Sequence, residues 1–260
     1  MVGTIRLMPF DPDQIPCTHR GCPFKMAVVI PWLTDDDEFP PVEQALTEPN
    51  GLLAAGDHLA PARLLAAYRN GIFPWYSDHQ PVLWWSPDPR MVLFPGEFRM
   101  PRSLAKRLRR RDFQIRVDSV FQEVVRGCAM PRSDDAGTWI TEDMIAAYCE
   151  LHRLGHAHCV ETWIDGELAG GLYGVALGRA FYGESMFTRV DDASKIAFAH
   201  LVRQLSRWQF GMIDCQMNTA HLARFGAREI PRVEFSRKLT ELVNYPSPAA
   251  VWQFEDDLFR

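Results

Sequence analysis

The segment from Phe73 to Pro89 constrains the fold of this chain most strongly, because it holds four prolines and three tryptophans within 17 residues. Proline lacks a backbone N–H and its ring clashes with the preceding turn, so no regular helix can run through such a segment. We therefore predict a rigid connection, walled by aromatic side chains, between two lobes. With 260 residues, the chain is long enough for one large domain or two modest ones.

One helix is predicted in the N-terminal lobe, over residues 61–70. A proline near its first position and a glycine after its last turn are typical helix boundaries, and the apolar residues between them recur on one face. Residues 1–25 show neither helical nor strand periodicity. We therefore predict an N-terminal extension over residues 1–33, with Met26 as an alternative first residue, and a small domain over residues 34–90.

The periodicity changes from helical to strand-like in the second half of the chain. The expected elements are helices over residues 103–111, 118–127 and 141–154, strands over 159–164, 168–176 and 179–187, a helix around 198–208, a strand over 212–217, and helices over 219–225 and 232–243. Asp118 and Thr141 are the expected N-caps of the second and third of these helices. The pair Asp165-Gly166 between the first two strands is a strong hairpin signal. This order predicts an α+β protein, in which helices pack on an antiparallel or mixed sheet in a domain over residues 91–260.

The composition excludes several classes of protein. No apolar run approaches the roughly 18 residues of a membrane helix, so we expect a soluble, cytoplasmic protein without membrane contact, and a monomer. The six cysteines are scattered along the chain, which favours reduced thiols over a disulfide framework. A formal net charge of −5 excludes a generally basic surface, so any contact with nucleic acid requires a local patch.

The densest basic stretch offers such a patch. It consists of Arg102, Lys106, Arg107, Arg109, Arg110 and Arg111. A run of this kind is usually a solvated helix face. In an acidic chain it is equally a place where an RNA backbone can bind, because phosphate contacts need charge and not sequence. The nearby Trp75, Trp84, Trp85 and Trp139 are either core residues or platforms for an unpaired base.

A carboxylate and an amide share one apolar strand, residues 212–217. Alternate residues of a strand share a face, so Asp214 and Gln216 are predicted to point the same way, roughly 7 Å apart. Burying them without partners would be costly. They therefore either form hydrogen bonds with neighbouring loops or orient an incoming amine and help to deprotonate it.

A second carboxylate, Glu184, lies inside the strongly apolar run 181–187. A buried glutamate is rare without a partner, so Glu184 is either ion-paired or functional. The glycine before it, Gly183, predicts a β-bulge that redirects the glutamate side chain.

Two other patterns are rejected. Gly183-x-Ser185 is similar to a nucleophile elbow, but Phe187 stands where the final glycine belongs, so no serine hydrolase is predicted. His152 and His156 are one helical turn apart, but a glycine interrupts the helix between them and no acidic ligand has matching spacing. A structural role is therefore favoured, and no metal site is predicted.

Seven stretches between residues 39 and 235 have the order and residue types of one known family. They are EPNGLLA at 48–54, GIFPW at 71–75, LWWSPDPR at 83–90, GTWIT at 137–141, LGHAH at 154–158, GESMF at 183–187 and IDCQ at 213–216. On these motifs the chain resembles the leucyl/phenylalanyl-tRNA–protein transferase family.

The resemblance implies a C-terminal domain with the acetyltransferase (GNAT) fold behind a small N-terminal domain. The implied reaction transfers Leu, Phe or Met from aminoacyl-tRNA to an acceptor protein that begins with Arg or Lys, which marks that protein for degradation. Since an aminoacyl ester is already activated, no metal, ATP or other cofactor is expected.

The resemblance also implies an apolar pocket for the side chain of the donor amino acid. The matching positions are Leu172, Phe181, Met186, Leu201 and Ile213. A well-known form of the family has Met in place of Leu172 and Phe in place of Leu201. Both changes keep the wall apolar, so the class of side chain is expected to be the same.

Five further positions match functional residues of the family. Trp75 and Trp139 correspond to residues that contact the terminal adenosine of the tRNA, and Glu184, Asp214 and Gln216 correspond to the proposed catalytic group.

Two rival classes share part of these features. A CoA-dependent N-acetyltransferase would share the implied fold, but its pyrophosphate-binding loop of the form Gln/Arg-x-x-Gly-x-Gly/Ala is absent from the sequence. A non-catalytic RNA-binding protein would need only the basic run and the tryptophans. It leaves Glu184, Asp214 and Gln216 unexplained.

Overall fold

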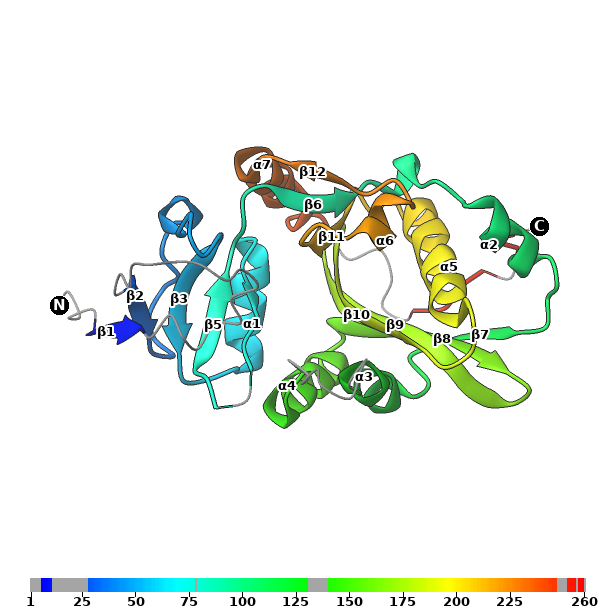
Figure 1. The fold of residues 1–260 in the computed structure, drawn as a ribbon, viewed down its shortest axis with the longest axis horizontal. Coiled ribbons are helices and arrows are strands. Elements are labelled where there is room, and N and C mark those ends of the chain that lie inside the picture. Colours follow the sequence, from blue (N-terminus) through cyan, green and yellow to red (C-terminus); the bar gives the residue numbers. More distant parts are fainter. Residues whose placement is uncertain are drawn as a thin grey trace, which may run out of the picture.

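The computed structural model describes residues 6–10, 28–77, 79–130, 140–246, 252–255 and 257–259. In these residues the strands form two sheets, one of five strands near the N-terminus and one of seven strands (Figure 1). Helices pack on both, so the predicted α+β class is confirmed. No described helix is long and apolar enough to cross a membrane.

The five-stranded sheet has the order β1-β2-β3-β5-β4. Its elements are β1 (Arg6–Phe10), β2 (Val28–Leu33), β3 (Leu52–Gly56), β4 (Phe73–Pro74) and β5 (Val82–Trp85), with a 3-10 turn at Val42–Gln44 and helix α1 (Pro61–Arg69). The helix predicted over residues 61–70 is therefore confirmed. Strand β2 pairs in parallel with β3, so residues that the sequence assigned to an extension contribute strands to this sheet.

The proline- and tryptophan-rich segment is partly sheet. Strands β4 and β5 pair antiparallel, with Phe73 opposite Trp85, and both Trp84 and Trp85 are buried in the core. The predicted rigid connection is thus wrong for Phe73–Pro74 and Val82–Trp85, which are strands of the five-stranded sheet. The chain crosses between the two sheets only from Trp85 to Arg90, and we propose a domain boundary there.

The seven-stranded sheet has the order β12-β6-β11-β10-β9-β8-β7. Its strands are β6 (Arg90–Leu93), β7 (Gln114–Val117), β8 (Ala157–Ile164), β9 (Glu167–Leu177), β10 (Ala180–Thr188), β11 (Met212–Gln216) and β12 (Arg228–Ile230). The helices around it are a 3-10 turn at Pro95–Glu97, α2 (Arg102–Leu108), α3 (Phe121–Ala129), α4 (Glu142–Arg153), α5 (Ala193–Arg207), α6 (Ala220–Ala223) and α7 (Arg232–Leu242). Helices α3 and α4 cover one face and α5 the other (Figure 1).

Local signals explain several of these boundaries. Asp165 and Gly166 both have positive φ, 52° and 82°, as the predicted β8–β9 hairpin requires. The Thr141 hydroxyl accepts a hydrogen bond from the Met144 amide at 3.3 Å, which confirms it as the cap of α4.

The predicted cap of α3 is wrong. The helix begins at Phe121, and the Asp118 carboxylate instead accepts hydrogen bonds from the Cys159 amide and from His158, each at 2.7 Å. The Nδ1 atom of His152 also lies 3.9 Å from Oδ1 of Asp118, and the His152 ring stacks on the ring of Phe121. These two histidines therefore hold β8 and α4 against the loop before α3.

Strands β10 and β11 form the one parallel pair among the described strands of the large sheet. They pair only from Ala180 to Tyr182 and from Met212 to Asp214. Beyond these residues no backbone pairing joins them, so side chains from both strands face a gap in the sheet.

A buried ion pair between β6 and β11 lies beside that gap, and its arginine also bonds the N-terminal part of the chain. The Arg90 guanidinium, fully buried, donates to both Asp214 oxygens at 2.8 and 2.6 Å and to the Gly71 carbonyl at 3.1 Å. Its planar group lies over the rings of Phe73 and Phe235, 4.7 and 4.6 Å from their centroids. Each of the three guanidinium nitrogens therefore has an acceptor, as a buried guanidinium requires.

Replacing Arg90 with Met is expected to lower the free energy of unfolding by about 3–5 kcal/mol, because Asp214 is left buried without a counter-charge. Urea unfolding measures this. As a control, Arg126→Ala removes an exposed pair with Glu142 and should cost less than about 1 kcal/mol. Equal losses in the two variants would contradict a special role for the buried pair.

Candidate active site

A cavity of about 440 Å³ lies where β10 and β11 diverge. Its walls include Leu172, Phe181, Met186, Leu201 and Ile213, the five positions expected to form an apolar pocket. Residues from β9, β10, β11 and α5 thus converge here, although they are up to 41 positions apart in sequence, from 172 to 213. The cavity can take one uncharged side chain of the size of Leu or Phe.

Glu184 lies on the wall of this cavity at the centre of a hydrogen-bond network. The register of β9 and β10 shifts between Gly183 and Ser185, so the predicted bulge is confirmed. Tyr68 and Tyr148 each donate to the Glu184 carboxylate at 2.8 Å, and the Gln216 amide nitrogen donates to it at 3.2 Å. Among the described residues, Glu184 is therefore held by hydrogen bonds and not by an ion pair.

Burial raises the pKa of Glu184 to about 7. The hydrogen bonds from Tyr68 and Tyr148 oppose this rise in pKa, and the nearby charge of Asp214 adds to it. Burial also raises the pKa of each tyrosine well above 10, so both hydroxyls stay protonated as donors. A carboxyl close to half-protonated at neutral pH can accept or release a proton with little cost.

Asp214 and Gln216 do not share a face as predicted. The β11–β6 register shifts between these two residues and Gln216 has a positive φ of 60°, so the strict alternation of a strand ends at Asp214. Gln216 lines the cavity, whereas Asp214 is buried behind it against Arg90. Asp214 instead accepts a hydrogen bond from the Gln216 backbone amide at 2.9 Å, which fixes the turn of the chain.

The tryptophans divide into two groups. Trp75 lines the cavity from the N-terminal part of the chain and contacts Trp85 edge-on, with ring centroids 5.5 Å apart. Trp84 and Trp85 are core residues and are not available for a base. The fourth candidate, Trp139, lies outside the described residues.

The basic run lies at the far end of the large sheet from the N-terminal part (Figure 1). The side chains of Arg102, Lys106, Arg109, Arg110 and Arg111 are exposed. Arg107 differs, because its side chain is 11% exposed and pairs with Asp112. The exposed members can neutralise phosphates, whereas Arg107 holds the end of α2 against the following loop.

Sequence reasoning missed Tyr68, Tyr148 and Arg90 as parts of this site. Tyr68 lies on the apolar face of the helix predicted over residues 61–70, where its hydroxyl gives no separate signal. Arg90 was visible only as the end of the LWWSPDPR motif. An arginine that opens an apolar strand such as Arg90–Leu93 is the one available sequence sign of a buried charge.

An apolar cavity beside a carboxyl of raised pKa and an amide can bind an uncharged side chain and can accept or release a proton. The described residues contain no cluster of His, Cys, Asp or Glu able to hold a metal ion. These features are those of a group-transfer enzyme whose substrate carries an apolar moiety.

Comparison with known proteins identifies the family. The family profile described as leucyl/phenylalanyl-tRNA protein transferase matches residues 92–240, and the profile described as its N-terminal domain matches residues 57–88. The leucyl/phenylalanyl-tRNA–protein transferase of Nitrosospira multiformis is 63% identical over 229 residues, 88% of this chain and 99% of that protein. The protein of the same name from Chromobacterium violaceum is 60% identical over 226 residues, 87% of this chain and 97% of that protein.

The chain belongs to the leucyl/phenylalanyl-tRNA–protein transferase family, as its motifs predicted, and is therefore an aminoacyltransferase. Among solved structures, a GCN5-related N-acetyltransferase from Kribbella flavida aligns with a TM-score of 0.32 at 13% identity, over 68% of this chain and 65% of that one. This likeness is too weak to bear on the fold.

Glu184 is expected to make stability depend on pH near neutrality. Its pKa of about 7 in the folded protein exceeds 4.5, the ordinary value, so the folded state binds the proton more tightly. The stabilisation is complete below about pH 4.5 and is lost as the pH rises to about 7. Glu184→Gln should remove this loss, measured by urea unfolding at several pH values. An identical pH dependence in both proteins would contradict the assignment.

Proposed function

We propose that the chain transfers a leucyl or phenylalanyl group, and also a methionyl group, from aminoacyl-tRNA to the N-terminal amine of an acceptor protein that begins with Arg or Lys. The product is a peptide bond, and the modified protein is marked for degradation. The observation that carries this proposal is the apolar cavity with Glu184 and Gln216 on its wall. Membership of the family supports the identity of donor and acceptor.

The transfer is an aminolysis of an ester. The acceptor nitrogen attacks the ester carbonyl carbon, the new C–N bond forms, the bond to the ribose oxygen breaks, and the proton of the amine passes to that oxygen. An N-terminal amine has an ordinary pKa near 8, so a useful fraction is neutral at pH 7. The protein mainly has to hold amine and ester together, which supplies several kcal/mol through orientation alone.

Gln216 is the residue best placed to orient the amine. Its side-chain carbonyl can accept an N–H, while its amide nitrogen is held by Glu184 at 3.2 Å. Asp214 acts through this residue, because it fixes the Gln216 backbone and is itself fixed by Arg90. Glu184, with a pKa of about 7, can accept the proton of the amine through Gln216 or a water, or hold a substrate amino group.

The apolar wall explains the class of donor. A branched or aromatic side chain that fills the cavity gains about 1.5–3 kcal/mol from burial. A charged or very small side chain gains none of this. Leu, Met and Phe differ by few methylenes, each worth about 1 kcal/mol, so discrimination among them should be modest.

Other parts of the chain fit the tRNA. Trp75 borders the cavity, as expected of a residue that contacts the terminal adenosine, and Trp139 is proposed to share this role. The exposed basic residues of the run would bind the tRNA backbone. The diverging parallel strands, with helices on both faces of the sheet, support a GNAT-like C-terminal domain. A cytoplasmic monomer is also proposed, since charged tRNA is cytoplasmic.

Mixing the protein with radiolabelled Leu-tRNA and a casein-like acceptor that begins with Arg or Lys tests the function. Incorporation of label into the acceptor is expected without added ATP, and the same acceptor with a blocked N-terminus should stay unlabelled. Gln216→Ala should lower kcat about 100-fold, since it removes the group that orients the amine.

Glu150→Gln, which alters an exposed carboxylate paired with Arg153, is the control for the Gln216 variant and should leave kcat unchanged. Asp214→Asn should also lower kcat, because it weakens the support of Gln216 and Arg90. Near-normal rates in both the Gln216 and the Asp214 variants would discard the polar group as the catalytic apparatus.

Leu201→Phe is expected to narrow the cavity and shift the preference towards the smaller donor. The ratio of kcat/KM for Leu-tRNA over Phe-tRNA should rise about tenfold, because Phe is the bulkier side chain. Leu201→Met, which conserves volume, is the control and should change the ratio by less than about threefold. An unaltered ratio in the Phe variant would place the donor side chain elsewhere.

A further inference from the structure

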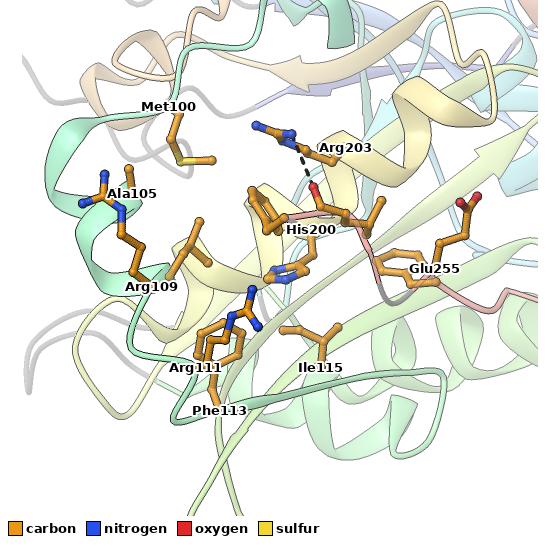
Figure 2. Close-up of a pocket in the computed structure, with 13 residues that line it drawn as sticks. Met100, Ala105, Arg109, Arg111, Phe113, Ile115, His200, Arg203 and Glu255 are labelled. Atoms are coloured by element: carbon orange, nitrogen blue, oxygen red, sulfur yellow. Dashed lines mark hydrogen bonds between the residues drawn. The ribbon is translucent and has the colours of Figure 1, made fainter.

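A second cavity, of about 680 Å³, lies against the opposite face of α5 (Figure 2). Phe198 and Leu201 of this helix face the active-site cavity, whereas His200 and Arg203 line the second one. Its other walls come from α2, from the chain leading into β7, and from Phe254, Glu255, Leu258 and Phe259 near the C-terminus. A cavity of this size can enclose a ligand as large as a nucleotide.

The charge on the rim of this cavity is positive. Arg109 and Arg111 line it, and among the described residues neither guanidinium forms an ion pair. Its carboxylate, Glu255, is already paired with Arg207. Arg203 is also occupied, because it donates to the Leu258 carbonyl at 3.3 Å (Figure 2). Two cations are therefore left to meet an anionic ligand.

An aromatic wall that includes one hydrogen-bond acceptor lies beside these cations. The His200 ring meets Phe113 and Phe259 edge-on, with centroids 5.7 and 4.5 Å away. Its Nδ1 lies 2.8 Å from the Ile196 carbonyl, which can only accept, so Nδ1 carries the proton. Burial lowers the pKa of His200 to about 4, so at neutral pH the ring is uncharged and Nε2 is an acceptor.

We propose that this cavity binds one unpaired nucleotide of the aminoacyl-tRNA, with its phosphate on Arg109 and Arg111 and an N–H of its base donated to His200. The aromatic rings of Phe113 and Phe259 supply the apolar surface that a base needs on leaving its stack. This inference rests on the proposed function, since it takes tRNA as the substrate.

The position of the two arginines favours RNA over a free nucleotide. They are two of the last three members of the basic run, whose exposed residues Arg102, Lys106 and Arg110 lie outside the cavity. A polyanion that follows this surface would bring one of its nucleotides to the mouth of the cavity. A free mononucleotide would use only the two arginines inside and would leave the exposed charges without a partner.

Neighbouring arginines provide a matched test. Arg109 lines the cavity and Arg110 does not, but each contributes one charge to the same exposed run. Filter binding of uncharged leucine tRNA should show about a tenfold rise in Kd for Arg109→Ala and about a threefold rise for Arg110→Ala. The salt dependence should decrease equally in both, by about one phosphate contact. His200→Phe, which keeps a ring but removes the acceptor, should raise Kd about fivefold.

Leucyl-adenosine, a donor too short to extend to the opposite face of α5, reports whether each variant retains a folded catalytic site. Equal Kd values for the Arg109 and Arg110 variants, with no effect of His200→Phe, would overturn the cavity as a nucleotide site. Adenosine monophosphate binding that is lost in His200→Phe while tRNA binding is unchanged would overturn tRNA as the occupant. Failure to transfer leucine from either donor in the wild type would instead refute the proposed function.

Discussion

The Arg90–Asp214 ion pair is the interaction on which the site depends. Arg90 opens β6, Asp214 lies in β11, and the same guanidinium bonds the Gly71 carbonyl from the N-terminal part of the chain. A charge pair removed from water is stable only with complete hydrogen bonding, which forces these three segments into one geometry. Asp214 then fixes the Gln216 backbone, so the position of the amide that we propose orients the acceptor amine follows from a pair buried behind the cavity.

The hydrogen bonds of Glu184 also depend on contact between the N-terminal part of the chain and the part that forms the seven-stranded sheet. One of its donors, Tyr68, comes from α1 beside the five-stranded sheet, and another, Tyr148, comes from α4 under the seven-stranded sheet. The N-terminal part is therefore a component of the site and not an appendage. Without Tyr68 the carboxylate would lose one of the hydrogen bonds that oppose the rise of its pKa, and the charged form would become still more costly.

The two faces of helix α5 line two different cavities. Phe198 and Leu201 of α5 face the cavity for the donor side chain, while His200 and Arg203 face the cavity proposed for a nucleotide. A rigid helix between two binding regions fixes their spacing. An extended donor such as tRNA can be held in one register by such an arrangement, and orientation of this kind is what an already activated ester requires.

The sequence by itself determined most of the helices and the strands β8 to β11, because periodicity, caps and hairpin glycines are local properties. The cap at Thr141, the turn at Asp165 and the bulge at Glu184 all follow from neighbours in the chain. The five apolar wall positions came from the resemblance to the family. Only the tertiary structure decided that Gln216 turns away from Asp214, because a register shift and a positive φ override strand alternation. It alone brought Tyr68 and Tyr148 to Glu184, since their approach depends on packing between segments more than 30 residues apart.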